Sequence, residues 1–300
     1  MSTPEELIAQ ADKKAKPVSG FSSLFSGSST YRFEEAADLY VQAANQYKLQ
    51  KNFSSAGKLF EKASESYLKA SSPDEAGNIL VESYKAYKNT SPADAARCLS
   101  KAIEHFTSRG QFRRAANFKC DLGDLYLLVN DKESAIKSFE DAGDWYSSDS
   151  AESLSNKSYL KAADLKAEMG NYIEAAETYE KIAEKSLSNN LTKWSTKDYF
   201  TKAILCRLAS DDYPGAFSKL DLFVTWDRTF ATTREFKFLN ELLENVKDGD
   251  SEAIGKSCAD YDQFSRLDNW KVSILTKIKD SVAGGGGNIV DGAGGEDDLT

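Results

Sequence analysis

Residues 56–67, AGKLFEKASESY, and residues 95–106, AARCLSKAIEHF, share one spacing of small and aromatic side chains. In each segment a second alanine follows the first after seven positions, and an aromatic residue follows the first after eleven. These offsets place all three side chains on one face of an α-helix. Small side chains there let neighbouring helices approach closely, and the aromatic ring fills the groove near the helix end. Both segments therefore predict closely packed helices.

The same triplet returns about every 20 residues through half of the chain. Its clear copies are Ala36, Ala43, Tyr47; Ala56, Ala63, Tyr67; Ala76, Ser83, Tyr87; Ala95, Ala102, Phe106; Ala115, Leu122, Tyr126; and Ala135, Ala142, Tyr146. Two weaker copies are Ser155, Ala162, Lys166 and Ala175, Ile182, Ser186. One helix and one turn per period gives a helical hairpin every 40 residues or so, and stacked hairpins form a solenoid that serves as a binding surface.

No segment alternates polar and apolar residues for long enough to predict a strand, so we predict an all-α fold. It is a TPR-like solenoid of helical hairpins forming a twisted sheet, capped by a C-terminal helical bundle. Beyond Lys197 the period fades although helical patterning persists, as in residues 234–246, REFKFLNELLENV. The predicted parts are an N-terminal helix and apolar loop over 1–30, the repeat sheet over 31–196, the bundle over 197–283, and a flexible Gly-rich acidic tail over 284–300.

Composition and charge narrow the functional classes. The formal net charge of −9 argues against a general nucleic-acid binder, whose affinity depends on neutralising phosphates. The first 30 residues hold no apolar segment typical of a secretory signal, and no apolar run approaches the length of a membrane span. The four cysteines lie far apart without CxxC spacing, which predicts reduced core thiols. We expect a soluble cytoplasmic protein.

No motif nominates an active site. The single His105 has no cysteine or carboxylate partners at metal-ligand spacing. Residues 255–257, GKS, match the end of a phosphate-binding loop, but Asp250 stands where that loop requires glycine, and no apolar strand precedes it. We therefore expect neither an enzyme nor a cofactor or metal site.

Three features stand out from this background. Phe21, Leu24 and Phe25 lie in a Ser/Gly-rich loop and either pack back onto the first helices or insert into a bilayer or a partner's groove. Basic residues recur along successive helices and form either a solvated face or a stripe for an acidic, elongated partner such as a helical bundle. They are Arg109, Arg113, Arg114, Lys119, Lys157, Lys161, Lys193 and Lys197. The ending EDDL, residues 296–299, is either a solubility tail or a docking peptide.

Several longer stretches are similar to one known family. They are residues 33–40, FEEAADLY; residues 20–29, GFSSLFSGSS; residues 109–116, RGQFRRAA; residues 195–200, STKDYF; residues 265–270, SRLDNW; and the EDDL ending. On these, the chain resembles the soluble NSF attachment proteins of the alpha type, essentially from end to end. The resemblance implies an adaptor in intracellular membrane fusion. Such adaptors wrap a four-helix SNARE bundle on membranes, then recruit and stimulate the hexameric AAA ATPase NSF, which disassembles it.

The resemblance also implies residue roles. Membrane binding is assigned to Phe21, Leu24 and Phe25, although Ser22 replaces one ring of the family's usual aromatic pair. SNARE contacts are assigned to Lys157, Lys161, Leu191, Trp194 and Lys197, with Arg113 or Arg114 compensating for Asn117 at a basic position of the family. ATPase contacts are assigned to Asp211, Glu244, Asp248, Glu296, Asp297, Asp298 and Leu299.

Other functions stay open on the pattern alone. A TPR-type co-chaperone that clamps peptide tails would need 34-residue repeats, whereas the period here is about 40 residues per hairpin. A generic helical-repeat scaffold and a regulator of an enzyme are the remaining alternatives. The adaptor that the resemblance implies would sit in the cytoplasm, peripherally associated with intracellular membranes.

Overall fold

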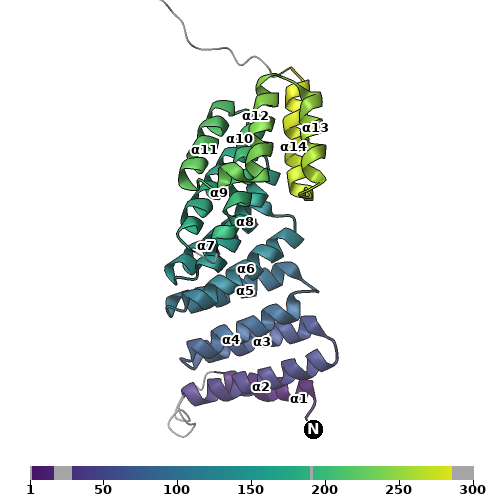
Figure 1. Ribbon diagram of the computed structural model, residues 1–300. Coiled ribbons are helices and arrows are strands. Elements are labelled where there is room, and N and C mark those ends of the chain that lie inside the picture. The colour runs from purple at the N-terminus through teal and green to yellow at the C-terminus, as the bar shows by residue number, and fades with distance from the viewer. Residues whose placement is uncertain (1, 17–28, 190–191, 286–300) are drawn as a thin grey trace, which may run out of the picture. The chain divides into compact units, whose positions relative to one another are not determined.

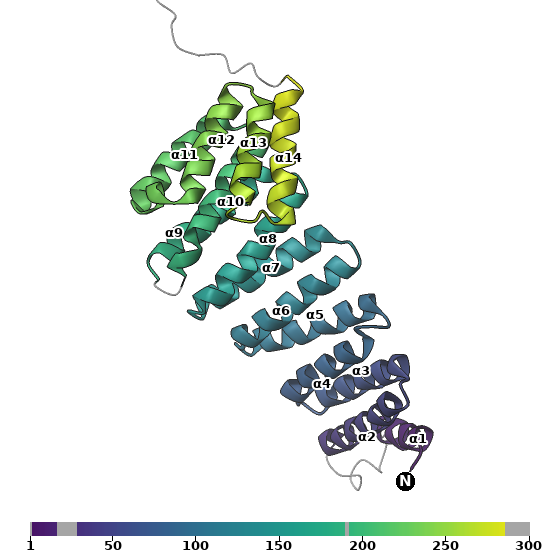
Figure 2. The ribbon, with the colours of Figure 1, turned by 45° about the vertical axis from the view of Figure 1, so that its right-hand side comes forward.

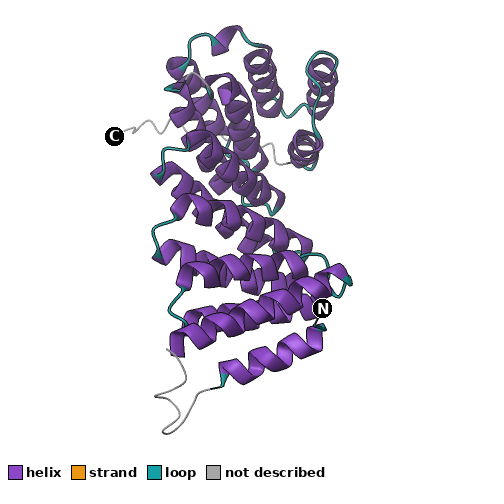
Figure 3. Cartoon of the chain, turned by 90° about the horizontal axis from the view of Figure 1, so that it is seen from below, coloured by secondary structure: helices purple, strands orange, loops and turns teal. Residues whose placement is uncertain are grey.

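The computed structural model describes residues 2–16, 29–189 and 192–285. Within these ranges the chain consists of helices joined by short loops, and no strand is present (Figure 3). The predicted all-α fold is thereby confirmed. The chain divides into two compact units, Met1–Ser158 (unit 1) and Tyr159–Thr300 (unit 2), and the division falls inside helix α8 (Glu152–Glu168). The four-part division expected from the sequence stays a prediction.

Unit 1 is a series of antiparallel helices in which each helix from α1 to α6 packs against the next one in the chain (Figures 1 and 2). Before α8 these are α1 (Pro4–Ala15), α2 (Ser29–Leu49), α3 (Phe53–Lys69), α4 (Pro73–Tyr87), α5 (Pro92–Ser108), α6 (Phe112–Leu128) and α7 (Lys132–Ser148). Proline begins α4 and α5, because its fixed φ suits the first helical turn and its missing N–H costs nothing there. Gly110 adopts a φ of 72° between α5 and α6, where a side chain would be strained.

The repeated triplets form the core of unit 1. The small residues of all six clear copies are buried, as the periodicity predicted. The ring of Tyr87 lies so close to Gly57 of α3 that an added Cβ would come within 2.5 Å of it. Phe106 lies against Gly77 of α4 in the same manner, with a distance of 3.2 Å to the ideal Cβ position. A glycine of one helix thus receives the terminal ring of the next.

Hydrogen-bonded polar groups lie at the edge of this core. The hydroxyl of Tyr67 donates to Asp38 at 2.6 Å, and that of Tyr87 donates to Glu61 at 3.1 Å. Glu61 also accepts from the two terminal guanidinium nitrogens of Arg97. Burial by itself would raise the pKa of Glu61, but the Arg97 and Tyr87 contacts outweigh burial and lower it. Glu61 is therefore a charged, partnered group at the boundary of the core.

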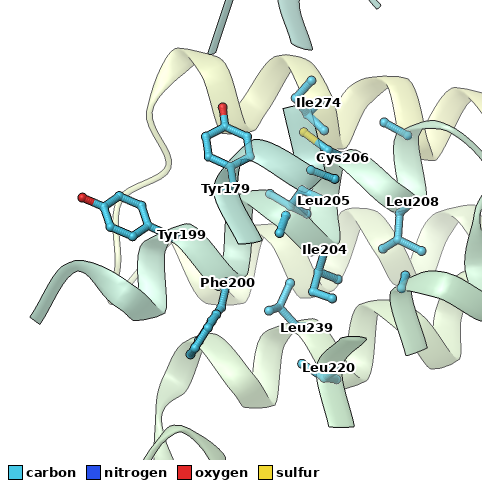
Figure 4. Close-up of a cluster of buried hydrophobic side chains, with 14 of the residues drawn as sticks. Tyr179, Tyr199, Phe200, Ile204, Leu205, Cys206, Leu208, Leu220, Leu239 and Ile274 are labelled. Atoms are coloured by element: carbon cyan, nitrogen blue, oxygen red, sulfur yellow. The ribbon is translucent and has the colours of Figure 1, made fainter. Parts of the chain in front are cut away.

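Unit 2 has a different organisation, with one helix surrounded by others. It contains the end of α8, α9 (Tyr172–Leu187), η2 (Lys193–Ser195), α10 (Thr196–Ala209), α11 (Tyr213–Trp226), η3 (Phe230–Thr232), α12 (Arg234–Lys247), α13 (Ser251–Asp262) and α14 (Asn269–Ala283). Helix α10 packs against α9, α11, α12 and α14, so its side chains are buried on nearly every face (Figure 4). At its centre Phe200 stacks on Phe223 with ring centroids 4.2 Å apart and meets Phe230 edge-on at 5.0 Å.

A buried lysine ties α14 to this core. Lys202 of α10 forms an ion pair with Asp164 of α8 at 2.6 Å. Its ammonium group lies 4.7 Å from the ring of Trp270 in α14 and 5.5 Å from that of Tyr179 in α9. The charge is thus both paired and placed on aromatic faces, which offsets the cost of its burial.

Candidate functional site

Part of the predicted site lies outside the described residues. The membrane-loop residues Phe21, Leu24 and Phe25, the SNARE-contact residue Leu191, and the tail residues Glu296, Asp297, Asp298 and Leu299 all fall there. In the described part of the chain, no helix is both long and apolar enough to cross a membrane. The same part holds no cluster of three or more histidine, cysteine or acidic side chains arranged to bind a metal ion.

The cysteines are structural thiols. All four are free, with Cys98 and Cys206 buried and Cys120 and Cys258 half-buried. Burial raises the pKa of the Cys98 thiol to about 11, and burial does the same for Cys258. A thiol with so high a pKa stays protonated at neutral pH and is a poor nucleophile. Cys98 and Cys258 are therefore unreactive as thiolates at neutral pH.

In unit 1 the two adjacent arginines of α6 have different environments. Arg113 is 62% exposed and forms a loose ion pair with Asp149, with 3.4 Å between Nε and Oδ2. Arg114 is half-buried, because its guanidinium group lies 4.0 Å from the centroid of the Phe106 ring and donates to Asn78 at 2.6 Å. Arg113 is thus free to reach a partner, whereas Arg114 is engaged in packing against its neighbours.

Asn117, which occupies a basic position of the family, is also engaged within unit 1. Its Oδ1 atom accepts a hydrogen bond of 2.5 Å from the hydroxyl of Tyr146. Lys119, which belongs to the same recurrence of basic residues, is paired with Asp141 at 2.7 Å and lies over the ring of Trp145. Among the described basic side chains of α6, Arg113 is mostly exposed, whereas Arg114 and Lys119 are half-buried.

Helix α8 carries Lys157 and Lys161, four residues apart. This spacing places both ammonium groups on one face of the helix, about one turn from each other. Lys157 is exposed and Lys161 is half-buried. Since a lysine can extend its ammonium group past the apolar part of its own stem, both can present charge to a partner on that face.

Unit 2 presents an exposed tryptophan beside a basic residue. Trp194, in the short helix η2, is 85% exposed, more than any other large aromatic side chain among the described residues. Thr196 holds the end of η2 by donating to the carbonyl oxygen of Lys193 at 2.6 Å. Lys197, in the first turn of α10, is exposed and forms an ion pair with Glu235 at 2.9 Å. The two side chains follow each other closely in the chain and both reach solvent.

Two of the predicted acidic residues of unit 2, Glu244 and Asp248, lie near Tyr213, and Asp211 precedes Tyr213 by two residues in the chain. Asp211 lies in the turn between α10 and α11, with a φ of 60°, and Glu244 and Asp248 lie at the end of α12. Burial raises the pKa of Tyr213, and the nearby negative charges of Glu244 and Asp248 raise it further. All three carboxylates are exposed. We call Asp211, Glu244 and Asp248 the acidic cluster.

The end of α14 adjoins the acidic cluster. The hydroxyl of Ser281 donates to Oδ1 of Asp211 at 2.8 Å, across 70 residues of sequence. The last turn of α14 therefore lies beside Asp211. Neither Tyr213 nor Ser281 was expected as part of this site, because no periodicity or motif relates them to the acids.

Comparison with known proteins extends over nearly the whole chain. The family model described as "Soluble NSF attachment protein, SNAP" matches residues 2–283. "Vesicular-fusion protein SEC17" of Komagataella phaffii is 55% identical over 285 residues, which cover 94% of this chain and 96% of that protein. "Alpha-soluble NSF attachment protein" of Saccharomyces cerevisiae is 48% identical and covers 94% of this chain and 97% of its own length. The human protein of the same name is 34% identical, with 93% and 94% covered.

Proposed function

The chain belongs to the soluble NSF attachment protein family, as its sequence resemblance predicted, and we propose that it is a vesicle-fusion adaptor that binds assembled SNARE bundles and brings an NSF-type ATPase to them. The observation that carries this proposal is the match of the family over residues 2–283, which includes both the repeat helices and the helices of unit 2. An adaptor needs exposed binding surfaces rather than an active site. It acts at the cytoplasmic surface of intracellular membranes and hydrolyses nothing itself.

The SNARE-binding surface is assigned to basic residues and one exposed tryptophan. Arg113, Lys157, Lys161 and Lys197 supply positive charge that would complement an acidic helical bundle, while Trp194 supplies a large apolar contact. Exposed charges of this kind contribute about 0–1 kcal/mol each. Binding is therefore distributed over several residues, and it weakens as salt screens them.

The ATPase-binding surface is assigned to the acidic cluster and the tail that follows α14. Support comes from the hydrogen bond that Ser281, near the end of α14, donates to Asp211, one of the three acids of the cluster. The two acidic segments could then act on one basic partner surface, with the tail supplied at high local concentration by its short tether. Phe21, Leu24 and Phe25 are assigned to reversible insertion into the membrane.

A pull-down on an immobilised SNARE bundle tests the proposal. The variant Lys157→Glu/Lys161→Glu/Lys197→Glu should bind the bundle far more weakly than the parent, and parental binding should fall with rising salt. The matched control is Lys58→Glu/Lys101→Glu/Lys277→Glu, which makes the same change in net charge at exposed positions outside the assigned surface. Equal binding by both variants would contradict the assignment. A parent that binds no bundle, and brings no ATPase to it, would contradict the proposed function itself.

A further inference from the structure

A groove runs between α13 and α14, which lie side by side in unit 2 (Figures 1 and 2). Its volume is about 370 Å³. Ile254 and Cys258 of α13 and Leu275 of α14 form its floor, and Val272 of α14 forms part of its wall. Val272 is 48% exposed, so part of an apolar side chain faces solvent on this side of α14. Ile254 and Leu275 are buried, so the apolar atoms that the described residues leave accessible in the groove include those of Val272 and the half-buried Cys258.

Two basic side chains border this apolar floor. Arg266 and Lys279 line the groove, both are exposed, and neither forms an ion pair with another described residue. Lys279 extends across α13, and its Nζ atom lies 3.2 Å from the position that a Cβ of Gly255 would occupy. The one acidic residue of the lining, Asp262, accepts a hydrogen bond of 2.7 Å from the backbone N–H of Leu267. The groove thus suits a ligand that combines apolar side chains with negative charge.

Residues 286–300, which lie outside the described residues, have this composition. The segment contains four acids, Asp291, Glu296, Asp297 and Asp298, and no basic residue. Its apolar residues include the adjacent pair Ile289 and Val290 and the later Leu299. The segment continues directly from α14, which is itself one wall of the groove.

The length of the chain permits the segment to return along α14. Val272 precedes Ala283 by eleven residues, which is about 17 Å at the helical rise. The six residues from Gly284 to Ile289 can span about 20 Å when extended. Ile289 and Val290 can therefore reach any part of the apolar floor, and the later acids have ample length to reach Arg266.

We propose that residues 286–300 bind back into the α13–α14 groove of their own chain. Ile289 and Val290 cover Cys258 and Val272, and the acids of the segment pair with Arg266 and Lys279. If the adaptor function proposed above holds and the same acids contact the ATPase, the bound tail is withheld from the ATPase until the ATPase competes for it.

The half-buried thiol of Cys258 reports directly on the groove. The full chain and a chain ending at residue 285 are treated with iodoacetamide, and alkylation of Cys258 is followed by mass spectrometry, with Cys120 of unit 1 as internal reference. Because only the open fraction reacts, a groove occupied four-fifths of the time should give about a fivefold faster reaction after truncation. Equal Cys258 rates in the two chains would overturn the proposal.

Point variants of the full chain keep the test independent of truncation. Ile289→Ser/Val290→Ser and Arg266→Glu should each accelerate Cys258 alkylation toward the rate of the truncated chain, and Lys279 is left unchanged because its charge lowers the pKa of the Cys258 thiol. The control Lys256→Glu/Lys277→Glu changes exposed residues of the same two helices that do not line the groove, and it should leave the rate unchanged. Protection that grows with protein concentration would instead identify a second copy as the occupant and overturn binding within one chain.

Competition between the groove and the ATPase for residues 286–300 is tested separately. When SNARE bundle and NSF-type ATPase are added to the full chain, Cys258 should react as fast as in the truncated chain. Continued protection, despite ATPase recruited to the bundle, would overturn the withheld tail while leaving the adaptor function intact. Failure of recruitment would contradict the proposed function but not the binding of the tail in the groove, which the first assay measures without any partner.

Discussion

In unit 1 the core lies between helices that follow each other in the chain, whereas in unit 2 it surrounds one helix that contacts four others. Unit 1 therefore repeats the same small residues at each interface, and Gly57 and Gly77 accept rings at equivalent positions. Unit 2 has no such repetition, because each face of α10 meets a different helix. The difference shows why one core is visible as a sequence period and the other is not.

The largest effect is expected where the unit 2 core is densest. Phe200→Ala should lower the free energy of unfolding of unit 2 by about 3–5 kcal/mol, because it removes a fully buried ring stacked between aromatic partners. Urea denaturation followed by tryptophan fluorescence measures this loss. Phe217→Ala on α11 is the matched control, since Phe217 is exposed and its loss should change stability by only about 0.5 kcal/mol. Similar losses for both variants would show that α10 is not the centre of this core.

Two glycine-to-alanine substitutions, one in each unit, are expected to change the free energy of unfolding in opposite directions. Gly57→Ala in unit 1 should destabilise by about 1–3 kcal/mol, since the new Cβ would overlap the ring of Tyr87. Gly255→Ala in unit 2 meets only the mobile end of Lys279 and should stabilise by up to about 1 kcal/mol through helix propensity. Thermal or urea unfolding decides the sign of each change. A stabilising Gly57→Ala would contradict close helix contact in the repeat.

A smaller change in the free energy of unfolding is expected at the charged edge of unit 1, where Glu61 pairs with Arg97. The lowered pKa of Glu61 means that its contribution to stability is present above the pKa of the unfolded chain and is lost as pH falls through the folded pKa. Glu61→Gln should therefore cost up to about 1 kcal/mol at pH 7, since Arg97 is partly exposed and screened, and the deficit should shrink below about pH 4. Stability curves against pH for this variant and for Glu65→Gln, an exposed control on the same helix, check it. A deficit that persists at pH 3 would rule out the ionised pair as its cause.

The smallest effect on stability is expected at the proposed interface. Trp194→Ala removes a ring that the fold leaves 85% exposed, so unfolding should change by only about 0.5 kcal/mol. SNARE-bundle binding should nevertheless weaken about tenfold or more, since buried tryptophans are frequent anchors of interfaces. Phe264→Ala, another exposed ring of unit 2, should alter neither quantity. Unchanged bundle binding by Trp194→Ala would remove this residue from the interface.

The sequence predicts the residue types of much of the proposed site, but it does not predict the surroundings of each side chain. The recurrence of basic residues predicted a charged stripe, yet it could not separate exposed Arg113 from Arg114, which is packed on Phe106. Their difference depends on which helix lies beside each side chain. In the same way, Glu244 and Asp248 were both expected in an acidic surface, while their shared neighbour Tyr213 carried no recognisable pattern.

By itself the sequence determined the all-α fold, the buried face of each repeat helix and the family, because these depend on periods and stretches within one segment of chain. Tertiary structure decided which distant side chains meet: Lys202 with Asp164 and Trp270, Ser281 with Asp211, and the apolar groove between α13 and α14. Such contacts arise from how non-adjacent helices pack, and a local spacing carries no information about a partner far away in the chain.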